Sequence, residues 1–176
     1  MYKNMIRLLV VFLFIPTLLI ADDLPQIRKE YYAAVNNEKA AEKFYQSIKK
    51  ADLSKPVILA YYGSAEAIRA KHAFNPYKKI VYLKSGLKTL QSAVGKSPDN
   101  LEIRFLRFSL EHYLPSFLGY SKHLETDRKK IVELCKQKKF GSMDKPLLKN
   151  LLAFMKESKR CSPAEIATLE QAISNG

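Results

Sequence analysis

Residues 97–114 have the sequence SPDNLEIRFLRFSLEHYL, which predicts a helix that other helices cover on two sides. Ser97 can cap its first turn, and Pro98 suits the first helical position. At about 100° per residue, the apolar side chains divide between two opposite faces. One face carries Leu101, Phe105, Phe108 and His112, and the other carries Ile103, Leu106, Leu110, Tyr113 and Leu114. A surface helix has one apolar stripe, so we expect this helix to lie at the centre of the fold.

Helical patterns also fill the rest of the chain beyond residue 22, and no segment shows the alternation of a β-strand. Apolar side chains recur at helical spacing over residues 24–35, 38–51, 56–71, 77–94, 121–139 and 144–158, and again after residue 162. Pro115 ends the central helix, because proline cannot continue the backbone hydrogen-bond ladder. Short connections favour antiparallel neighbours, so we predict an all-α fold of about eight helices in consecutive antiparallel hairpins. It forms one domain over residues 22–176.

Two local signals mark a helix start and a close helix contact. Ser162, Pro163 and Glu165 match a capping box, in which the Ser and Glu side chains bind each other's backbone N–H groups. Gly63 lies inside the helix predicted over residues 56–71, where glycine costs about 1 kcal/mol relative to alanine. Other small side chains surround it. This composition indicates that a neighbouring helix approaches closely at Gly63.

The first 21 residues have the layout of a secretory signal peptide. Lys3 and Arg7 precede an apolar run over residues 8–20, and Ala21 comes directly before an acidic pair. A basic start, a short apolar run and a small residue at the cleavage position are typical of exported proteins. We therefore expect a periplasmic or secreted protein. An N-terminal anchor that is kept is the alternative, although a membrane span needs about 20 apolar residues.

The chain is basic, with a formal net charge of +13. Such an excess attracts nucleic acid, anionic lipid or acidic proteins. Most lysines are spread along helix faces, and an exported protein rarely meets nucleic acid. We therefore expect a solvated basic surface and no nucleic-acid partner. The alternative is a weak contact with anionic envelope surfaces through one lysine cluster, which consists of Lys129, Lys130, Lys136, Lys138 and Lys139.

The chain has two cysteines, Cys135 and Cys161. In an oxidising compartment such a pair can form a disulfide. Each cysteine lies near the end of a predicted helix, so the bridge would tie together the flanks of a hairpin. Two buried free thiols are the alternative. Neither cysteine has a second ligand close by, and structural zinc normally has four, so we predict no metal site.

Residues 86–98 carry the spacing of a known helical repeat. Gly86, Leu90, Ala93 and Pro98 follow the pattern small-x3-large-x2-Ala-x4-Pro, so this stretch resembles the second helix of a tetratricopeptide repeat. The signature of that family's first helix is missing, since charged residues such as Arg104 occupy its positions. The resemblance implies stacked helical hairpins that bind a protein or peptide. The overall pattern is also similar to that of small exported proteins of Gram-negative bacteria.

The charged strip of the central helix is the first candidate binding site. Arg104, Arg107 and Glu111 lie on one strip at spacings of three and four residues. Two guanidinium groups could hold a carboxylate or a phosphate. The alternative is a structural ion network with neighbours such as Glu66 or Asp99, because a half-buried charge needs a partner.

Aromatic residues and one further arginine complete the predicted groove. Tyr61, Tyr62 and Arg69 belong to the helix over residues 56–71, and Tyr120 follows the central helix. Tyrosine and arginine dominate many interfaces, although tyrosines that only pack are the alternative. The histidines lack a metal-binding spacing and the chain has no catalytic motif. We expect a protein- or peptide-binding or scaffolding module that is not an enzyme and has no cofactor; an enzyme of unknown type is the further alternative.

Overall fold

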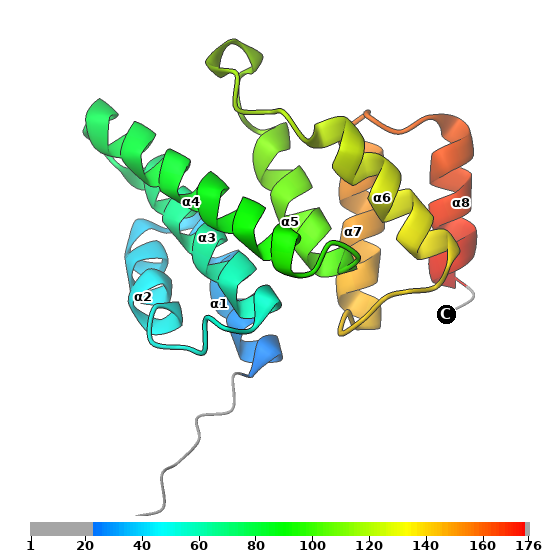
Figure 1. Ribbon diagram of the computed structural model, residues 1–176, viewed down its shortest axis with the longest axis horizontal. Coiled ribbons are helices and arrows are strands. Elements are labelled where there is room, and N and C mark those ends of the chain that lie inside the picture. Colours follow the sequence, from blue (N-terminus) through cyan, green and yellow to red (C-terminus); the bar gives the residue numbers. More distant parts are fainter. Residues whose placement is uncertain (1–22, 175–176) are drawn as a thin grey trace, which may run out of the picture.

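The computed structural model describes residues 23–174, and this part of the chain consists of eight α-helices, one short 3-10 helix and no strand (Figure 1). The all-α fold class predicted from the sequence is confirmed. The predicted signal peptide lies outside the described residues. The elements are α1 (Leu24–Asn36), α2 (Glu38–Ile48), α3 (Pro56–His72), α4 (Pro76–Lys96), α5 (Leu101–His112), η1 (Ser116–Leu118), α6 (Leu124–Lys136), α7 (Lys145–Glu157) and α8 (Pro163–Ser174).

Side-chain caps fix where several helices begin. Asn37, Asn75 and Asp144 each accept hydrogen bonds from backbone N–H groups of the first helical turn, at 2.8 to 3.3 Å. The predicted capping box at α8 is confirmed, because the Ser162 N–H donates to Glu165 Oε2 at 2.8 Å and the Glu165 N–H donates to Ser162 Oγ at 3.3 Å. These caps satisfy donors that a helix start leaves unpaired.

The central helix begins later than its sequence suggested. α5 starts at Leu101 with Asn100 as its cap, since Asn100 Oδ1 accepts the N–H of Ile103 at 3.1 Å. The predicted cap, Ser97, instead closes a turn, in which its carbonyl accepts the N–H of Asn100 at 3.2 Å. The prediction of Ser97 was wrong because asparagine is at least as good a cap as serine and stands next to the helix.

Two hydrophobic cores meet at α5. Ile103 and Leu106 belong to the core that α1–α5 enclose, whereas Leu101, Phe105 and Phe108 belong to the core that α5–α8 enclose. The predicted central helix with two apolar faces is therefore confirmed. The face predicted to continue through residues 113 and 114 stops earlier, since the helix ends at residue 112 and the side chain that follows is exposed.

The α3–α4 pair is closely packed because both helices carry a glycine at their contact. A Cβ atom on Gly63 would lie 2.9 Å from the Gly86 carbonyl oxygen, and one on Gly86 would lie 2.5 Å from the Gly63 carbonyl oxygen. Real Cβ atoms do not approach backbone oxygen this closely. The close helix approach predicted at Gly63 is confirmed.

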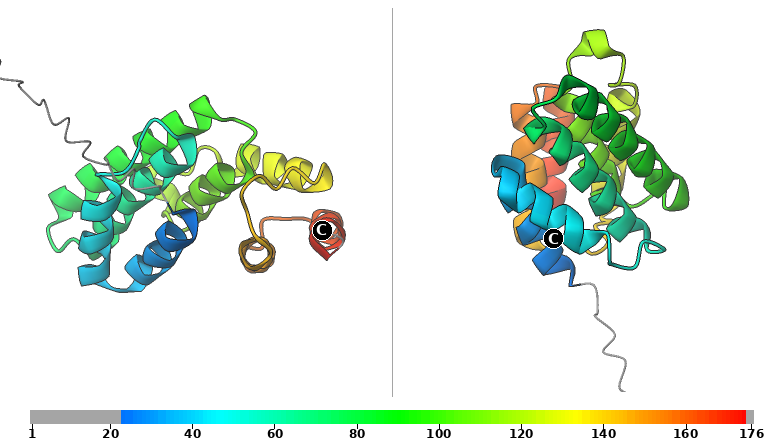
Figure 2. Two further views of the ribbon diagram at one scale, coloured as in Figure 1. Left: turned by 90° about the horizontal axis from the view of Figure 1, so that it is seen from below. Right: turned by 90° about the vertical axis from the view of Figure 1, so that its left-hand side faces the viewer.

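α3 and α5 organise the arrangement of the other helices (Figures 1 and 2). α3 contacts α1, α2, α4 and α5, while α6 lies on α5 and α8, and α7 lies on α8. Helices that follow one another in sequence are thus often neighbours, but the α6–α8 contact skips one helix. The regular repeat of hairpins stays a prediction. None of the described helices has the length and apolar character that a membrane span requires.

Candidate functional site

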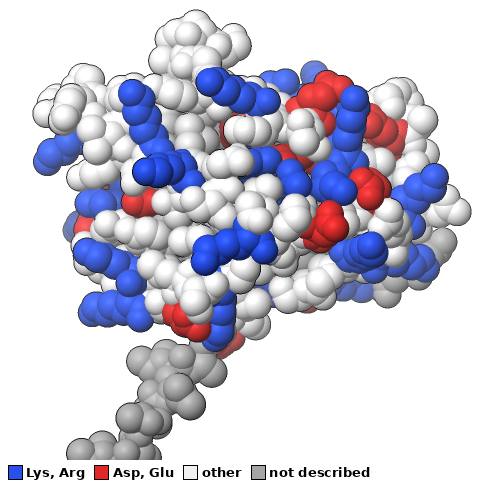
Figure 3. Space-filling view, in the orientation of Figure 1, with Lys and Arg blue, Asp and Glu red and all other residues white. Residues whose placement is uncertain are grey.

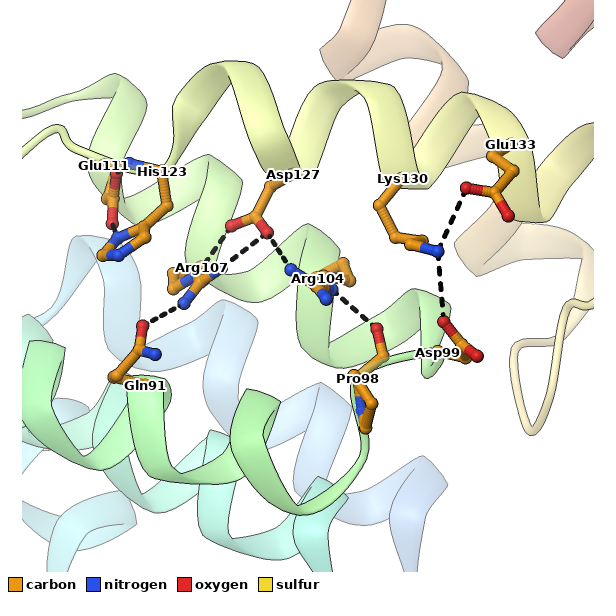
Figure 4. Close-up of polar contacts among 10 residues, drawn as sticks. All are labelled: Gln91, Pro98, Asp99, Arg104, Arg107, Glu111, His123, Asp127, Lys130 and Glu133. Atoms are coloured by element: carbon orange, nitrogen blue, oxygen red, sulfur yellow. Dashed lines mark hydrogen bonds and ion pairs between the residues drawn. The ribbon is translucent and has the colours of Figure 1, made fainter.

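The arginines of the predicted strip point into the contact between α5 and α6, where Asp127 binds both (Figure 4). Arg104 Nη1 donates to Asp127 Oδ1 at 2.8 Å, and Arg107 donates through Nε and Nη2 to the two carboxylate oxygens at 2.7 Å each. Arg104 Nε also donates to the Pro98 carbonyl at 2.7 Å, and Arg107 Nη1 donates to Gln91 of α4. The Asp127 side chain is fully buried. One carboxylate therefore ties α5 to α6.

Glu111, the acidic member of the strip, binds the start of α6 rather than an arginine (Figure 4). Its Oε2 accepts the His123 backbone N–H at 2.7 Å, and its Oε1 lies 2.7 Å from His123 Nδ1. The Glu111 carbonyl accepts the Ser121 hydroxyl at 2.9 Å. A carboxylate beside a helix N-terminus is favoured by the helix dipole, so Glu111 fixes where α6 begins.

A second buried network lies on the opposite side of α5, around Glu102. Arg28 of α1 donates through Nε and Nη2 to the two Glu102 oxygens at 2.8 and 2.7 Å. The Tyr61 hydroxyl donates to Glu102 Oε1 at 2.7 Å, and the Ser142 hydroxyl donates to Oε2 at 3.0 Å. The hydrogen bond to Glu102 raises the pKa of Arg28, and burial raises the pKa of Tyr61. The predicted binding residue Tyr61 is thus part of the core.

Both are structural ion networks, which was the alternative interpretation of the charged strip. Their partners, however, are not the ones that the sequence suggested. Glu66 accepts hydrogen bonds from the Ser85 and Thr89 hydroxyls at 2.7 and 2.8 Å. Asp99 pairs with Lys130 at 3.2 Å. Neither binds the arginines of the strip. Within residues 23–174 every buried side-chain nitrogen and oxygen has a hydrogen-bond partner, so the networks are complete without a ligand.

Arg69 is the predicted site residue that lines an open pocket. The pocket has a volume of about 350 Å³ and lies between α2, the end of α3 and the start of α4. Arg69 Nε donates to Glu42 Oε2 at 2.9 Å, and its Cζ lies 4.0 Å from the Tyr45 ring centroid and 4.3 Å from that of Tyr82. Phe74 lies at the rim of the pocket with a fully exposed side chain. Cation–π contacts with the two rings therefore restrain the guanidinium group beside this opening.

The other two predicted tyrosines do not join Arg69 at the pocket. Tyr62 is half-buried and stacks on Tyr45, with ring centroids 5.7 Å apart. Tyr120 is half-buried between η1 and α6, a segment that Figure 1 shows far from α2. The residues of the predicted groove therefore do not form one site. Arg69 lines a pocket, the other two arginines, Glu111 and Tyr61 belong to buried networks, and Tyr120 lies in a distant connection between helices.

Neither cysteine forms a disulfide, and both pack in a hydrophobic core. Cys135 and Cys161 are free thiols, and both contribute to the hydrophobic core that α5–α8 enclose. Burial raises the pKa of Cys135 to about 12.

In the lysine cluster, Lys129 pairs with Glu125 at 2.9 Å, and Lys130 pairs with both Glu133 and Asp99. The remaining three lysines of the cluster are exposed.

Sequence reasoning missed the partners that complete the networks, above all Arg28, Glu102 and Asp127. On the helical wheel Glu102 lies between the two apolar faces of α5, opposite the charged strip, and Arg28 interrupts the apolar face of α1. These two positions are the signal that could have identified Glu102 and Arg28 as buried partners. In the described chain, no group of three or more His, Cys, Asp or Glu side chains could hold a metal ion.

Comparison of the chain with family models, with curated proteins and with solved structures found no match. The resemblance to tetratricopeptide repeats and the similarity to exported proteins of Gram-negative bacteria therefore stay predictions. The geometry of the described residues is the basis for any functional proposal.

Proposed function

We propose that this exported protein is a non-catalytic binding module that takes a short segment of another protein in the pocket beside Arg69. The observation that carries the proposal is the position of this guanidinium group. It lies against two tyrosine rings and lines an open pocket. The other arginines of the predicted groove are bound inside the fold.

The pocket offers charged and apolar contacts side by side. The Arg69 fork has five N–H donors, so a peptide carboxylate can share it with Glu42, whose side chain is half-exposed. The Phe74 ring on the rim provides an apolar contact. Because the two tyrosines already hold Arg69 in place, little side-chain freedom is lost on binding. These features suit a peptide with an acidic residue next to an apolar one.

In this proposal, α5 is the framework that holds the pocket in shape. Its two networks fix α1, α3 and α6 around it, and α3 carries Arg69. A rigid scaffold with a preformed pocket is typical of peptide-binding modules.

A peptide selected from a random library on the purified protein provides the probe. Its dissociation constant, measured by fluorescence anisotropy, should rise at least tenfold in Arg69→Ala, since an arginine anchor at an interface contributes about 1.4 kcal/mol or more. The matched control is Lys149→Ala, which removes an exposed basic side chain from α7. Phe74→Ala is the second test variant. The Phe74 ring is fully exposed, so its removal should not affect the fold. Equal affinities for wild type, Arg69→Ala and Phe74→Ala would overturn the proposal.

A further inference from the structure

Two turns of the protein expose aromatic side chains to solvent. At the α3–α4 turn, Phe74 is 101% exposed and Tyr77 is also exposed, and the next turn of α4 adds exposed aliphatic side chains. In the α5–α6 connection, Phe117 is 84% exposed and Tyr113 is exposed as well. We call residues 74–81 the first tip and residues 113–117 the second tip. Large apolar side chains that gather at the surface of a soluble protein commonly mark an interaction site.

The two tips lie at neighbouring corners of the molecule. Figure 1 shows the connection that contains η1 above α5 at the top of the view, and the α3–α4 turn at the upper left, at the end of α3 and α4. The right-hand view of Figure 2 again places both at the top. One broad surface could therefore contact both tips at once.

The chain around both tips lacks negative charge. Residues 67–98 and residues 112–124 contain no Asp or Glu. The first of these segments carries Lys71, Lys78 and Lys79 next to the tip, with Arg69 in the pocket beside it and Lys84, Lys88 and Lys96 farther along α4, and the second segment carries Lys122. Figure 3 shows uncharged surface at the projecting second tip, with basic side chains on the body below it. The segments that carry the tips thus combine aromatic rings with basic side chains, and the acidic side chains beside the first tip are Glu38 and Glu42 of α2, on the side of the Arg69 pocket.

We propose that the two tips dock the protein on the surface of an anionic phospholipid bilayer. The ring of Tyr77 would lie in the headgroup region, where amphipathic rings are enriched, and the apolar ring of Phe117 would enter the boundary between headgroups and acyl chains. The lysines next to the first tip would lie close to lipid phosphates, and each such lysine strengthens attachment. This attachment is peripheral and leaves the helical fold unchanged.

This surface differs from the two basic sites considered so far. The lysine cluster lies on α6 and on the connection after it, away from the first tip in Figure 1, and two of its members pair with acidic side chains. The Arg69 pocket adjoins the first tip, and Lys78 and Phe74 line it. Tyr77, Tyr113 and Phe117 do not line it. Substitution of these side chains therefore tests lipid docking without changing the lining of the pocket.

The absence of tryptophan from the chain allows a direct test in the protein without its predicted signal peptide, because the apolar run over residues 8–20 would itself enter vesicles. Tyr77→Trp and Phe117→Trp each place one fluorescent reporter on a tip, and Lys139→Trp places the control in the α6–α7 connection, at the opposite side of Figure 1. With vesicles of phosphatidylcholine and phosphatidylglycerol, emission at both tips should shift to shorter wavelength and be quenched by brominated lipid. The control should not respond, and neither tip should respond to phosphatidylcholine alone.

A pair of charge variants tests the same proposal through affinity. Lys78→Ala combined with Lys79→Ala should weaken binding to the anionic vesicles on the order of thirty-fold, because each lysine near the surface contributes about a factor of five. Lys136→Ala combined with Lys139→Ala removes the same charge from the α6 cluster and should leave binding unchanged. Arg69→Ala should keep most of it. Equal responses of tips and control, a larger loss from the α6 pair, or no binding to anionic vesicles would each overturn the proposal.

Discussion

Asp127 of α6 binds Arg107 of α5 through two parallel hydrogen bonds of 2.7 Å, and its side chain is fully buried. This two-pronged geometry is the strongest form of an arginine–carboxylate pair. Arg104 adds a third hydrogen bond to the same carboxylate at 2.8 Å. One acidic residue therefore balances two guanidinium groups at the contact between the two cores.

Removal of Asp127 should strongly destabilise the protein. Asp127→Ala leaves Arg104 and Arg107 buried without their partner, which costs about 3–5 kcal/mol in free energy of unfolding. Asp99→Ala is the control, because Asp99 is exposed and pairs with Lys130 at the surface, where such a pair contributes at most about 1 kcal/mol. Urea denaturation followed by circular dichroism measures both. Similar losses for the two variants would show that the buried network is not important for stability.

The contact of α3 with α4 should depend on its glycines. In Gly86→Ala the new Cβ would lie 2.5 Å from the Gly63 carbonyl oxygen and 2.8 Å from the Ala67 nitrogen. Backbone atoms cannot move aside cheaply, so the helices must separate, at a cost of about 1–3 kcal/mol.

Gly95→Ala on the same helix provides the matched control, because a Cβ there meets no atom within 4 Å. It should stabilise the protein by about 0.5–1 kcal/mol through the better helix propensity of alanine. Thermal unfolding measures both substitutions. A Gly86→Ala variant as stable as Gly95→Ala would contradict the close approach.

The two cysteines should differ in reactivity. Burial holds the pKa of Cys135 at about 12, so only about one thiol in ten thousand is ionised at pH 8. Cys161 is less buried, although burial also raises its pKa. Iodoacetamide followed by mass spectrometry should therefore modify Cys161 first in the native protein, and both cysteines in urea. Protection of both in urea until a reductant is added would reveal the disulfide that the sequence allows.

Alkaline pH should weaken the fold through ionisation of Tyr31, a partly buried tyrosine that packs against the core of α1–α5. Burial raises the pKa of Tyr31 to about 12, whereas tyrosine in the unfolded chain ionises near pH 10. Above pH 10 the unfolded state loses a proton that the native state keeps, so stability falls as pH rises. Between pH 9 and pH 11 the wild type should lose about 1 kcal/mol more than Tyr31→Phe in urea denaturation. Parallel losses in the two proteins would mean that Tyr31 ionises normally.

Local patterns predicted the helices and the two faces of α5 because these depend on residue spacing alone. Ile103 and Leu106 on one side and Phe105 and Phe108 on the other follow from helical geometry. Asp127 could not be identified as the partner of the arginines, since this depends on how α6 lies across α5. The exposure of Phe74 and Phe117 was also missed, because an apolar side chain is by default expected in a core. Arg69 was predicted as a site residue, but its cation–π contacts with Tyr45 and Tyr82 were not.

One measurement tests directly whether the Arg69 pocket is the binding site and α5 is only the framework that supports it. Titration of the isotope-labelled protein with the selected peptide, followed by two-dimensional NMR, reports on every backbone amide at once. The largest shifts should occur around Glu42, Arg69 and Phe74, and α5 should change little because its networks are internal. Shifts centred on Arg104, Arg107 or the neighbouring start of α6 would contradict this division and place the site in the strip between the two cores.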